Sequence, residues 1–269
     1  MSHGILNPML PALAAALIIT GCFAWKRNAP FDVLDWALLA YAAAWQVAGL
    51  AAPWDFPAAL RAAIPLVGGP LLCICLRAAF PPRDGADRLR ARLAAAALVA
   101  GALAVVLAVP PAIRIPRSDL AAAARLAFTQ HPVFGWGPGQ FGRFTSRWLP
   151  AARGVSASAE IPGAVTARGS VTLDPPDLYR HHLTDGGLVV AAALVLLVAA
   201  AFVTLLPPAF GRRADPAARV GLAAIAGWLV WGLYASPLLA AGPMLALMVA
   251  LGLAAPTRLV RGRLAPSRR

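Results

Sequence analysis

Apolar runs long enough to cross a lipid bilayer constrain this chain more than any other feature. A helix needs about 20 apolar residues to cross a hydrocarbon layer of about 30 Å, because each residue advances it by about 1.5 Å. Of the 269 residues, 60% are hydrophobic and 13% are charged, which is too apolar for a soluble domain of this size. We therefore expect an all-α integral membrane protein with about seven transmembrane helices. The seven runs are Pro8–Trp25, Val33–Ala52, Phe56–Leu76, Leu89–Pro110, Leu188–Leu206, Ala218–Tyr234 and Pro237–Ala254.

Lys and Arg residues gather in alternate connections between these runs. They stay on the cytoplasmic side of a membrane because translocating them is costly. With the N-terminus outside, the first, third and fifth connections and the C-terminal tail hold 15 of the 24 Lys and Arg residues. This predicts a four-helix membrane region (1–112), an external segment (113–187), C-terminal membrane helices (188–255) and a basic cytoplasmic tail (256–269). Only two residues separate the last two runs, which form either a tight hairpin or one region broken at Pro237.

Several function classes are not expected from this composition. The net charge of +13 comes without a basic patch interleaved with aromatic residues, so no nucleic-acid partner is predicted. Cys22, Cys73 and Cys75 fall inside apolar runs, which indicates neither a disulfide framework nor a metal site. Gly21-Cys22 is similar to a lipoprotein cleavage box, but Lys26-Arg27 follow the run instead of preceding it, which favours a retained span. Few charges lie within the runs, which argues against an ion path.

The external segment is the one long stretch that could not lie inside a bilayer, so any chemistry is expected there. Ser118 is expected to cap a short helix that ends near Gln130, because Pro132 disfavours helical geometry at the residue before it. Residues 150–176 hold hardly any large apolar side chains and are predicted to have no core of their own. An apolar stripe would let the short helix lie on the membrane surface. This stripe consists of Leu120, Ala124, Ala127 and Phe128.

A glycine-rich string follows this short helix. Gly135, Gly137 and Gly139 alternate within the string His131–Phe141. Glycine lets backbone N–H groups approach an anion, so the string could cradle a phosphate. No predicted strand precedes it, which excludes the Rossmann and P-loop interpretations. The alternative is a tight turn at the membrane surface.

The order of these elements resembles the O-antigen ligase and polymerase superfamily. That order is Arg117, a surface helix, the His131–Phe141 string, a variable segment, and Asp177-Leu178-Tyr179 leading through Asp185-Gly186-Gly187-Leu188 into a span. Members of this superfamily are bacterial membrane enzymes that move glycans from a polyprenyl pyrophosphate carrier on the outer face of the inner membrane. The resemblance covers residues 113–254, about half of the chain. It implies a metal-independent glycosyltransferase of surface polysaccharide assembly that needs no cofactor and meets a polyprenyl-linked glycan and membrane lipid.

The same resemblance suggests roles for single residues. Arg117 matches an arginine on which these enzymes depend, and a guanidinium suits a pyrophosphate leaving group because it forks onto phosphate oxygens. The family's histidine, proposed to activate the acceptor hydroxyl, falls on Pro176, so Asp177 or His181 is expected to act as the base, with His182 as a further substitute. The residues expected to bind substrate are His131, Gly135, Gly137, Gly139 and Arg180.

This departure from the family pattern leaves a second class of function open. A chain descended from such an enzyme could serve as a non-catalytic membrane subunit or scaffold that binds a membrane-protein partner. The absent histidine favours the scaffold, whereas Arg117 and the glycine string favour the enzyme.

Overall fold

The computed structural model of this chain describes residues 31–53, 56–80, 87–108, 117–142, 177–212, 214–233 and 241–255. The predicted first span, Pro8–Trp25, the segment 150–176 and the tail 256–269 lie outside these residues. Within them the main elements are helices, which confirms the all-α class. The helices are α2 (Val33–Leu50), α3 (Phe56–Ala79), α4 (Asp87–Ala108), α5 (Arg117–Gln130), α7 (Leu178–Phe210), α8 (Pro216–Gly232) and α9 (Ala241–Ala254).

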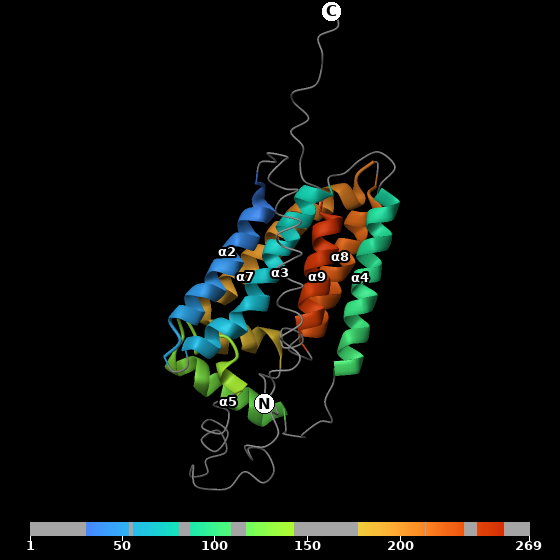
Figure 1. Ribbon diagram of the computed structural model, residues 1–269. Coiled ribbons are helices and arrows are strands. Elements are labelled where there is room, and N and C mark those ends of the chain that lie inside the picture. Colours follow the sequence, from blue (N-terminus) through green and yellow to red (C-terminus); the bar gives the residue numbers. More distant parts are fainter. Residues whose placement is uncertain are drawn as a thin grey trace, which may run out of the picture.

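All of these helices except α5 run along a common axis, with consecutive helices in opposite directions (Figure 1). Helix α2 packs against α3 and α7, α9 packs against α3 and α4, and α8 packs against α7 and α9. Helix α5 lies across one end of this bundle, which we call the α5 end, and contacts α7 there. The C-terminal ends of α3, α7 and α9 lie at the opposite end.

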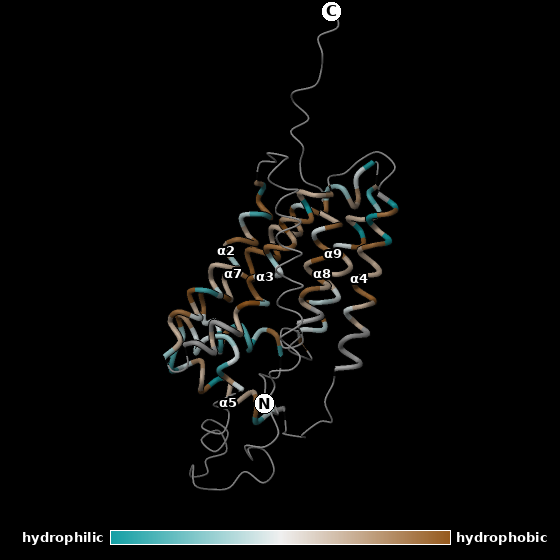
Figure 2. The backbone as a smooth tube through the Cα atoms, viewed as in Figure 1, coloured by the Kyte–Doolittle hydropathy of each residue, from teal (hydrophilic) through white to brown (hydrophobic). Residues whose placement is uncertain are grey.

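Three helices in the described part of the chain are long and apolar enough to cross a membrane. They are Val33–Leu50, the Ala62–Ala79 part of α3, and Leu178–Phe210. Brown, hydrophobic colour covers the middle of the bundle, and α5 carries more of the hydrophilic teal (Figure 2). The fold therefore supports a multi-pass membrane protein.

The last predicted span is shorter than expected. Helix α8 has 17 residues, as many as its predicted run, whereas α9 has 14, so an ideal α9 would be about 21 Å long. Pro237, where a hairpin or a break was predicted, lies outside the described residues. Helix α7 instead begins ten residues before the predicted span, at Leu178, because polar residues continue the helix beyond the apolar run.

The bundle core is built mainly from alanine and leucine, as expected where small residues let helices approach closely. Gly252 of α9 is one such position, because a Cβ there would lie 2.8 Å from the Leu76 Cβ. Gly227 of α8 is not one, since a Cβ there would meet no atom within 4 Å.

Two predictions about α5 are wrong. The helix begins at Arg117, so Ser118 lies inside its first turn and donates its hydroxyl to the Asp119 carboxylate instead of capping the helix. The apolar stripe faces protein rather than a membrane surface, because Ala124 and Ala127 are buried in a cluster with aromatic side chains of the glycine string. The helix ends at Gln130 as predicted.

Arginines at the opposite end of the bundle bind the last carbonyl groups of the helices. The side-chain Nε of Arg90 donates to Leu253 O at 2.9 Å, and that of Arg219 donates to Ala209 O at 3.0 Å. Cations at these positions also complement the helix dipole. Some arginines that the sequence assigns to membrane orientation therefore also hold the ends of α7 and α9.

Candidate functional site

The glycine string forms a turn at the α5 end of the bundle. Gly135, Gly137 and Gly139 have φ values of 68°, 94° and 72°, which favour glycine over residues with a Cβ. Trp136 lies between two of these glycines and Phe141 follows the last of them. Both side chains pack on α5, where the Trp136 indole donates to Ala127 O at 2.8 Å. The alternative prediction, a tight turn, describes this backbone.

This turn is inserted into a break in α7. At Gly187 the backbone leaves helical geometry, with φ 65° and ψ −166°. The break exposes carbonyl groups before it and N–H groups after it, and the turn pairs with both sets. Before the break, Trp136 N donates to Thr184 O and Gly137 N donates to Asp185 O, both at 2.9 Å.

After the break the direction of donation is reversed. Leu188 N donates to Pro132 O at 2.8 Å, and Val189 N donates to Val133 O at 3.2 Å. The broken helix thus keeps its freed backbone groups satisfied, which a lipid environment requires. The predicted boundary between the external segment and the following span coincides with this break at Gly187.

Two glycines permit this close contact. A Cβ on Gly135 would lie 2.5 Å from the Asp185 carbonyl carbon, and a Cβ on Gly187 would lie 2.3 Å from Val133 O. Both contacts are with backbone, which cannot rotate away as a flexible side chain could. The two motifs of the sequence, 45 or more residues apart, therefore meet as backbone against backbone.

The side chain of Asp185 anchors the rest of the turn. Its carboxylate is buried and accepts hydrogen bonds from Gly139 N at 2.8 Å and from Phe141 N at 3.0 Å. The backbone N–H groups of the turn do cradle a carboxyl group, but that group belongs to the protein. Gly135 N donates to His131 O at 3.0 Å, so the N–H groups of all three glycines are engaged within the chain. A phosphate would have to displace these contacts, and phosphate binding there stays a prediction.

His182 is held by two hydrogen bonds inside the bundle. Its Nδ1 lies 2.8 Å from Leu178 O, and its Nε2 lies 2.9 Å from the Tyr41 hydroxyl of α2. The Trp45 ring, one turn further along α2, lies 5.5 Å from the His182 ring. Helix α2 thus contributes to a site for which its sequence showed no motif.

His181 is also buried, with 3% of its surface exposed. Its ring lies 6.0 Å from that of Trp45 in an edge-on arrangement. On its other side, Nε2 lies 3.6 Å from the Asp185 Oδ2 atom, which is an electrostatic contact and slightly too long for a hydrogen bond. The histidines are therefore internal residues rather than polar groups at a membrane surface.

Asp177 and Arg180 form a pair at the start of α7. The Asp177 carboxylate caps the helix by accepting from Arg180 N at 2.8 Å, and it also forms an ion pair with the Arg180 guanidinium. Asp177 is buried, whereas the Arg180 side chain is 45% exposed. These contacts give Asp177 a structural role, and a proton acceptor there would first have to release Arg180.

Arg117 and His131 lie at opposite ends of α5. Arg117 begins the helix, and the structure describes its backbone but not its side chain. The turn folds back along α5, so that Leu120, one helical turn beyond Arg117, packs on the cluster that holds Phe141. The His131 ring packs edge-on against Trp136 with 4.2 Å between ring centres. The predicted role of the Arg117 guanidinium on a pyrophosphate falls on a side chain outside the described atoms and stays a prediction.

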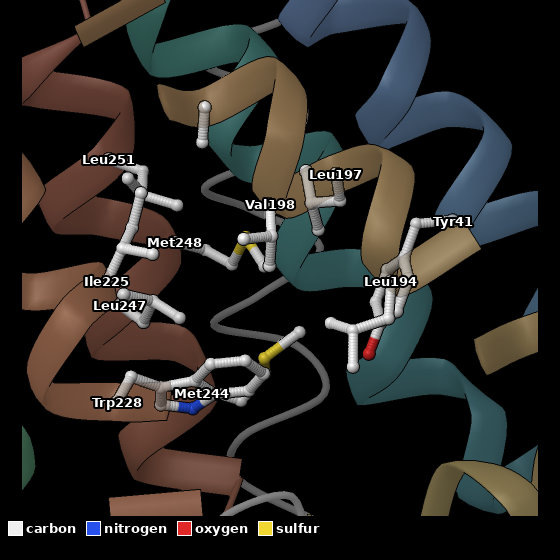
Figure 3. Close-up of a pocket in the computed structure, with 11 residues that line it drawn as sticks. Tyr41, Leu194, Leu197, Val198, Ile225, Trp228, Met244, Leu247, Met248 and Leu251 are labelled. Atoms are coloured by element: carbon white, nitrogen blue, oxygen red, sulfur yellow. The ribbon is translucent and has the colours of Figure 1, made fainter. Parts of the chain in front are cut away.

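A narrow apolar cavity lies deeper in the bundle, between α2, α7, α8 and α9 (Figure 3). Its space is about 320 Å³ including the open mouth, and Trp228, Met244 and Met248 are among its lining residues. Tyr41 also lines it, so the residue that binds His182 contacts both the cavity and the buried histidine.

Comparison with models of protein families, with curated proteins and with solved structures gives no match for this chain. The structure itself brings together the glycine string and the residues from Asp177 to Gly187. It adds Tyr41, Trp45 and Asp185, which the sequence analysis did not select as site residues. The spacing of Tyr41 and Trp45 by four residues on an otherwise alanine-rich helix was the available signal for the first two. No group of His, Cys, Asp or Glu among the described residues could hold a metal ion.

Proposed function

We propose that this chain belongs to surface polysaccharide assembly in a bacterial inner membrane and resembles the O-antigen ligases and polymerases in activity. In this proposal it transfers a glycan from a polyprenyl pyrophosphate carrier on the outer face, with the N-terminus outside and the C-terminus in the cytoplasm. The observation that carries the proposal is the meeting of the glycine string with the start of α7, where His181 and Asp185 are buried together. Ionisable residues buried within a membrane protein most often serve a function.

The reaction assigns one task to each candidate residue. An acceptor hydroxyl oxygen forms a bond to the anomeric carbon, and the bond from that carbon to the pyrophosphate oxygen breaks, with its electron pair remaining on the pyrophosphate. The base, His181 or Asp177, takes the hydroxyl proton. Arg117 stabilises the charge that develops on the leaving pyrophosphate. Of the two bases, His181 is the better supported, because the Asp177 carboxylate already caps α7 and pairs with Arg180.

A second candidate function is supported by the same end of the bundle. The backbone N–H groups of the glycines are engaged within the chain, and both histidines are covered by α2. A closed turn of this kind suits a non-catalytic membrane subunit that uses the α5 end to bind a membrane-protein partner. The two candidates differ in whether single polar residues matter for glycan transfer.

Substitution of Arg117 tests the transferase directly. In cells that lack the chromosomal copy, Arg117→Ala should abolish glycan transfer at an unchanged protein level, and Arg117→Lys should restore little because an ammonium lacks the bidentate fork. Arg125→Ala is the matched control, since Arg125 lies exposed on the same helix. His181→Ala and Asp177→Asn then ask which residue is the base. A normal glycan profile in all of these variants, with loss of the profile on deletion of the gene, would replace the transferase by the scaffold.

Orientation in the membrane is tested by single cysteines placed in the connections. We expect labelling from outside at Ala157 and Ser236 and no labelling at Ala86 or Ala214. Labelling of Ala86 from outside would reverse the orientation and remove the link to carriers on the outer face.

A further inference from the structure

The two buried histidines have different partners, and those partners determine which ring nitrogen carries the proton. A backbone carbonyl can only accept a hydrogen bond, so Leu178 O requires the proton of a neutral His182 to be on Nδ1. The Nε2 atom is then an acceptor, and the Tyr41 hydroxyl donates to it. Both nitrogens of His182 are therefore occupied, Nδ1 by a bond within α7 and Nε2 by the bond that holds α7 to α2.

The partner of His181 has the opposite effect. The Asp185 carboxylate lies 3.6 Å from the His181 Nε2 atom and has no proton to donate in its charged form. In that charged form the carboxylate favours, at this distance, the tautomer with the proton on Nε2 and the lone pair on Nδ1. The carboxylate itself cannot turn away, because Gly139 N and Phe141 N hold its two oxygens.

We propose that Asp185 is a positioning residue that keeps His181 in the Nε2–H tautomer, while Tyr41 and Leu178 keep the neighbouring His182 in the Nδ1–H tautomer. The roles that follow from these tautomers rest on the proposed function. His181 has the role of base, and His182 has a structural role. Asp185 acts through His181 in the way that a carboxylate orients the imidazole in other base–carboxylate pairs. It also links this orientation to the glycine turn, since one carboxylate serves both.

Nitrogen NMR of the full chain with ¹⁵N-labelled histidine tests the assignment. The sequence holds four histidines, and His3→Gln with His131→Gln leaves only the two buried ones. In the otherwise unchanged protein at neutral pH, we expect one imidazole protonated at Nδ1 and the other at Nε2. Asp185→Asn should give His181 signals from both tautomers and leave His182 unchanged. Tyr41→Phe should shift the His182 Nε2 resonance and leave His181 unchanged.

Several results would overturn the proposal. If the spectrum of the protein with Asp185 intact shows both imidazoles protonated on Nδ1, the proposal is refuted, even if Asp185→Asn fails to fold. A His181 signal that is the same with and without the Asp185 carboxylate would refute it as well. A general loss of packing would instead shift both histidines in both variants, and this outcome also counts against a specific role of Asp185.

The transfer assay then separates this inference from the proposed function. His181→Gln should reduce glycan transfer by at least about 100-fold, the usual contribution of a general base, and Tyr41→Phe by less than about tenfold. Opposite tautomers in a protein without transfer activity would support the positioning by Asp185 and refute the transferase. Transfer activity with His181 protonated on Nδ1 would support the transferase and refute the positioning.

Discussion

Gly135→Ala should be among the most destabilising small substitutions in this chain. Its φ of 68° costs a residue with a Cβ roughly 1–2 kcal/mol, and the added Cβ would lie 2.5 Å from backbone of α7. The turn would have to move away, which endangers the bonds from Trp136 N to Thr184 O and from Gly137 N to Asp185 O. At about 1 kcal/mol for each bond, the total loss is about 3–4 kcal/mol.

Gly227→Ala provides the matched control for this substitution. A Cβ at Gly227 meets nothing within 4 Å, and alanine in a helix gains up to about 1 kcal/mol over glycine. For a protein of this size, about 1 kcal/mol corresponds to about 2–4 °C in Tm. In detergent we expect the melting transition of Gly135→Ala to fall by about 6–16 °C, and that of Gly227→Ala to stay level or rise slightly. Equal Tm values for the two variants would refute the insertion of the turn into α7.

Two further stability predictions concern other parts of the bundle. Burial acts to raise the pKa of Asp32, but the Arg77 guanidinium and the backbone N–H groups outweigh it, so the pKa lies below the ordinary value of 3.8. The charged Asp32 carboxylate therefore stabilises the fold above pH 3.8, and this stabilisation is lost as the pH falls below that value. We expect the Tm to drop in that acidic range, and to drop by less in Asp32→Asn. Trp136→Phe should lower Tm by about 2–4 °C more than Trp228→Phe, because the Trp136 indole N–H bonds to Ala127 O, whereas that of Trp228 has no partner among the described residues. Equal Tm values for Trp136→Phe and Trp228→Phe would count against a stabilising hydrogen bond from the Trp136 indole.

The helices could be predicted from the sequence because a membrane-length apolar run is a strong and local signal. Helices α2, α3 and α4 begin or end within a few residues of the predicted runs. The start of α7 was missed because residues from Leu178 to Gly186 are mostly polar and have no apolar periodicity. Their helical signal was the capping residue Asp177, which the resemblance had assigned to catalysis instead.

The site could be predicted only in its parts. The three alternating glycines predicted backbone that approaches an anion, whereas the group that this backbone binds within the chain is the Asp185 carboxyl group, more than 40 residues further along the chain. The burial of His181 and His182 depended on α2, about 140 residues upstream. Periodicity and spacing describe neighbours along the chain, and these partners are neighbours only in the folded bundle.

The arginines at the end opposite α5 connect orientation with stability, and Arg77 can separate the two. Its guanidinium is buried, binds the carboxylates of Asp32 and Asp35, and donates from Nε to Ala255 O at 3.4 Å. Orientation depends on the number of positive charges, whereas these contacts depend on the shape of the guanidinium.

Arg77→Lys keeps the charge but cannot reach three acceptors at once, so it should leave the cysteine-labelling pattern unchanged and lower Tm. Arg77→Ala should cost more, about 3–5 kcal/mol, because it leaves the buried Asp35 carboxylate and the partly buried Asp32 carboxylate without their partner. Since one charge among 15 is removed, the labelling pattern should hold in this variant too. A wild-type Tm for Arg77→Lys would mean that charge alone holds this end together, and a reversed labelling pattern would mean that the contacts of Arg77 also determine the orientation.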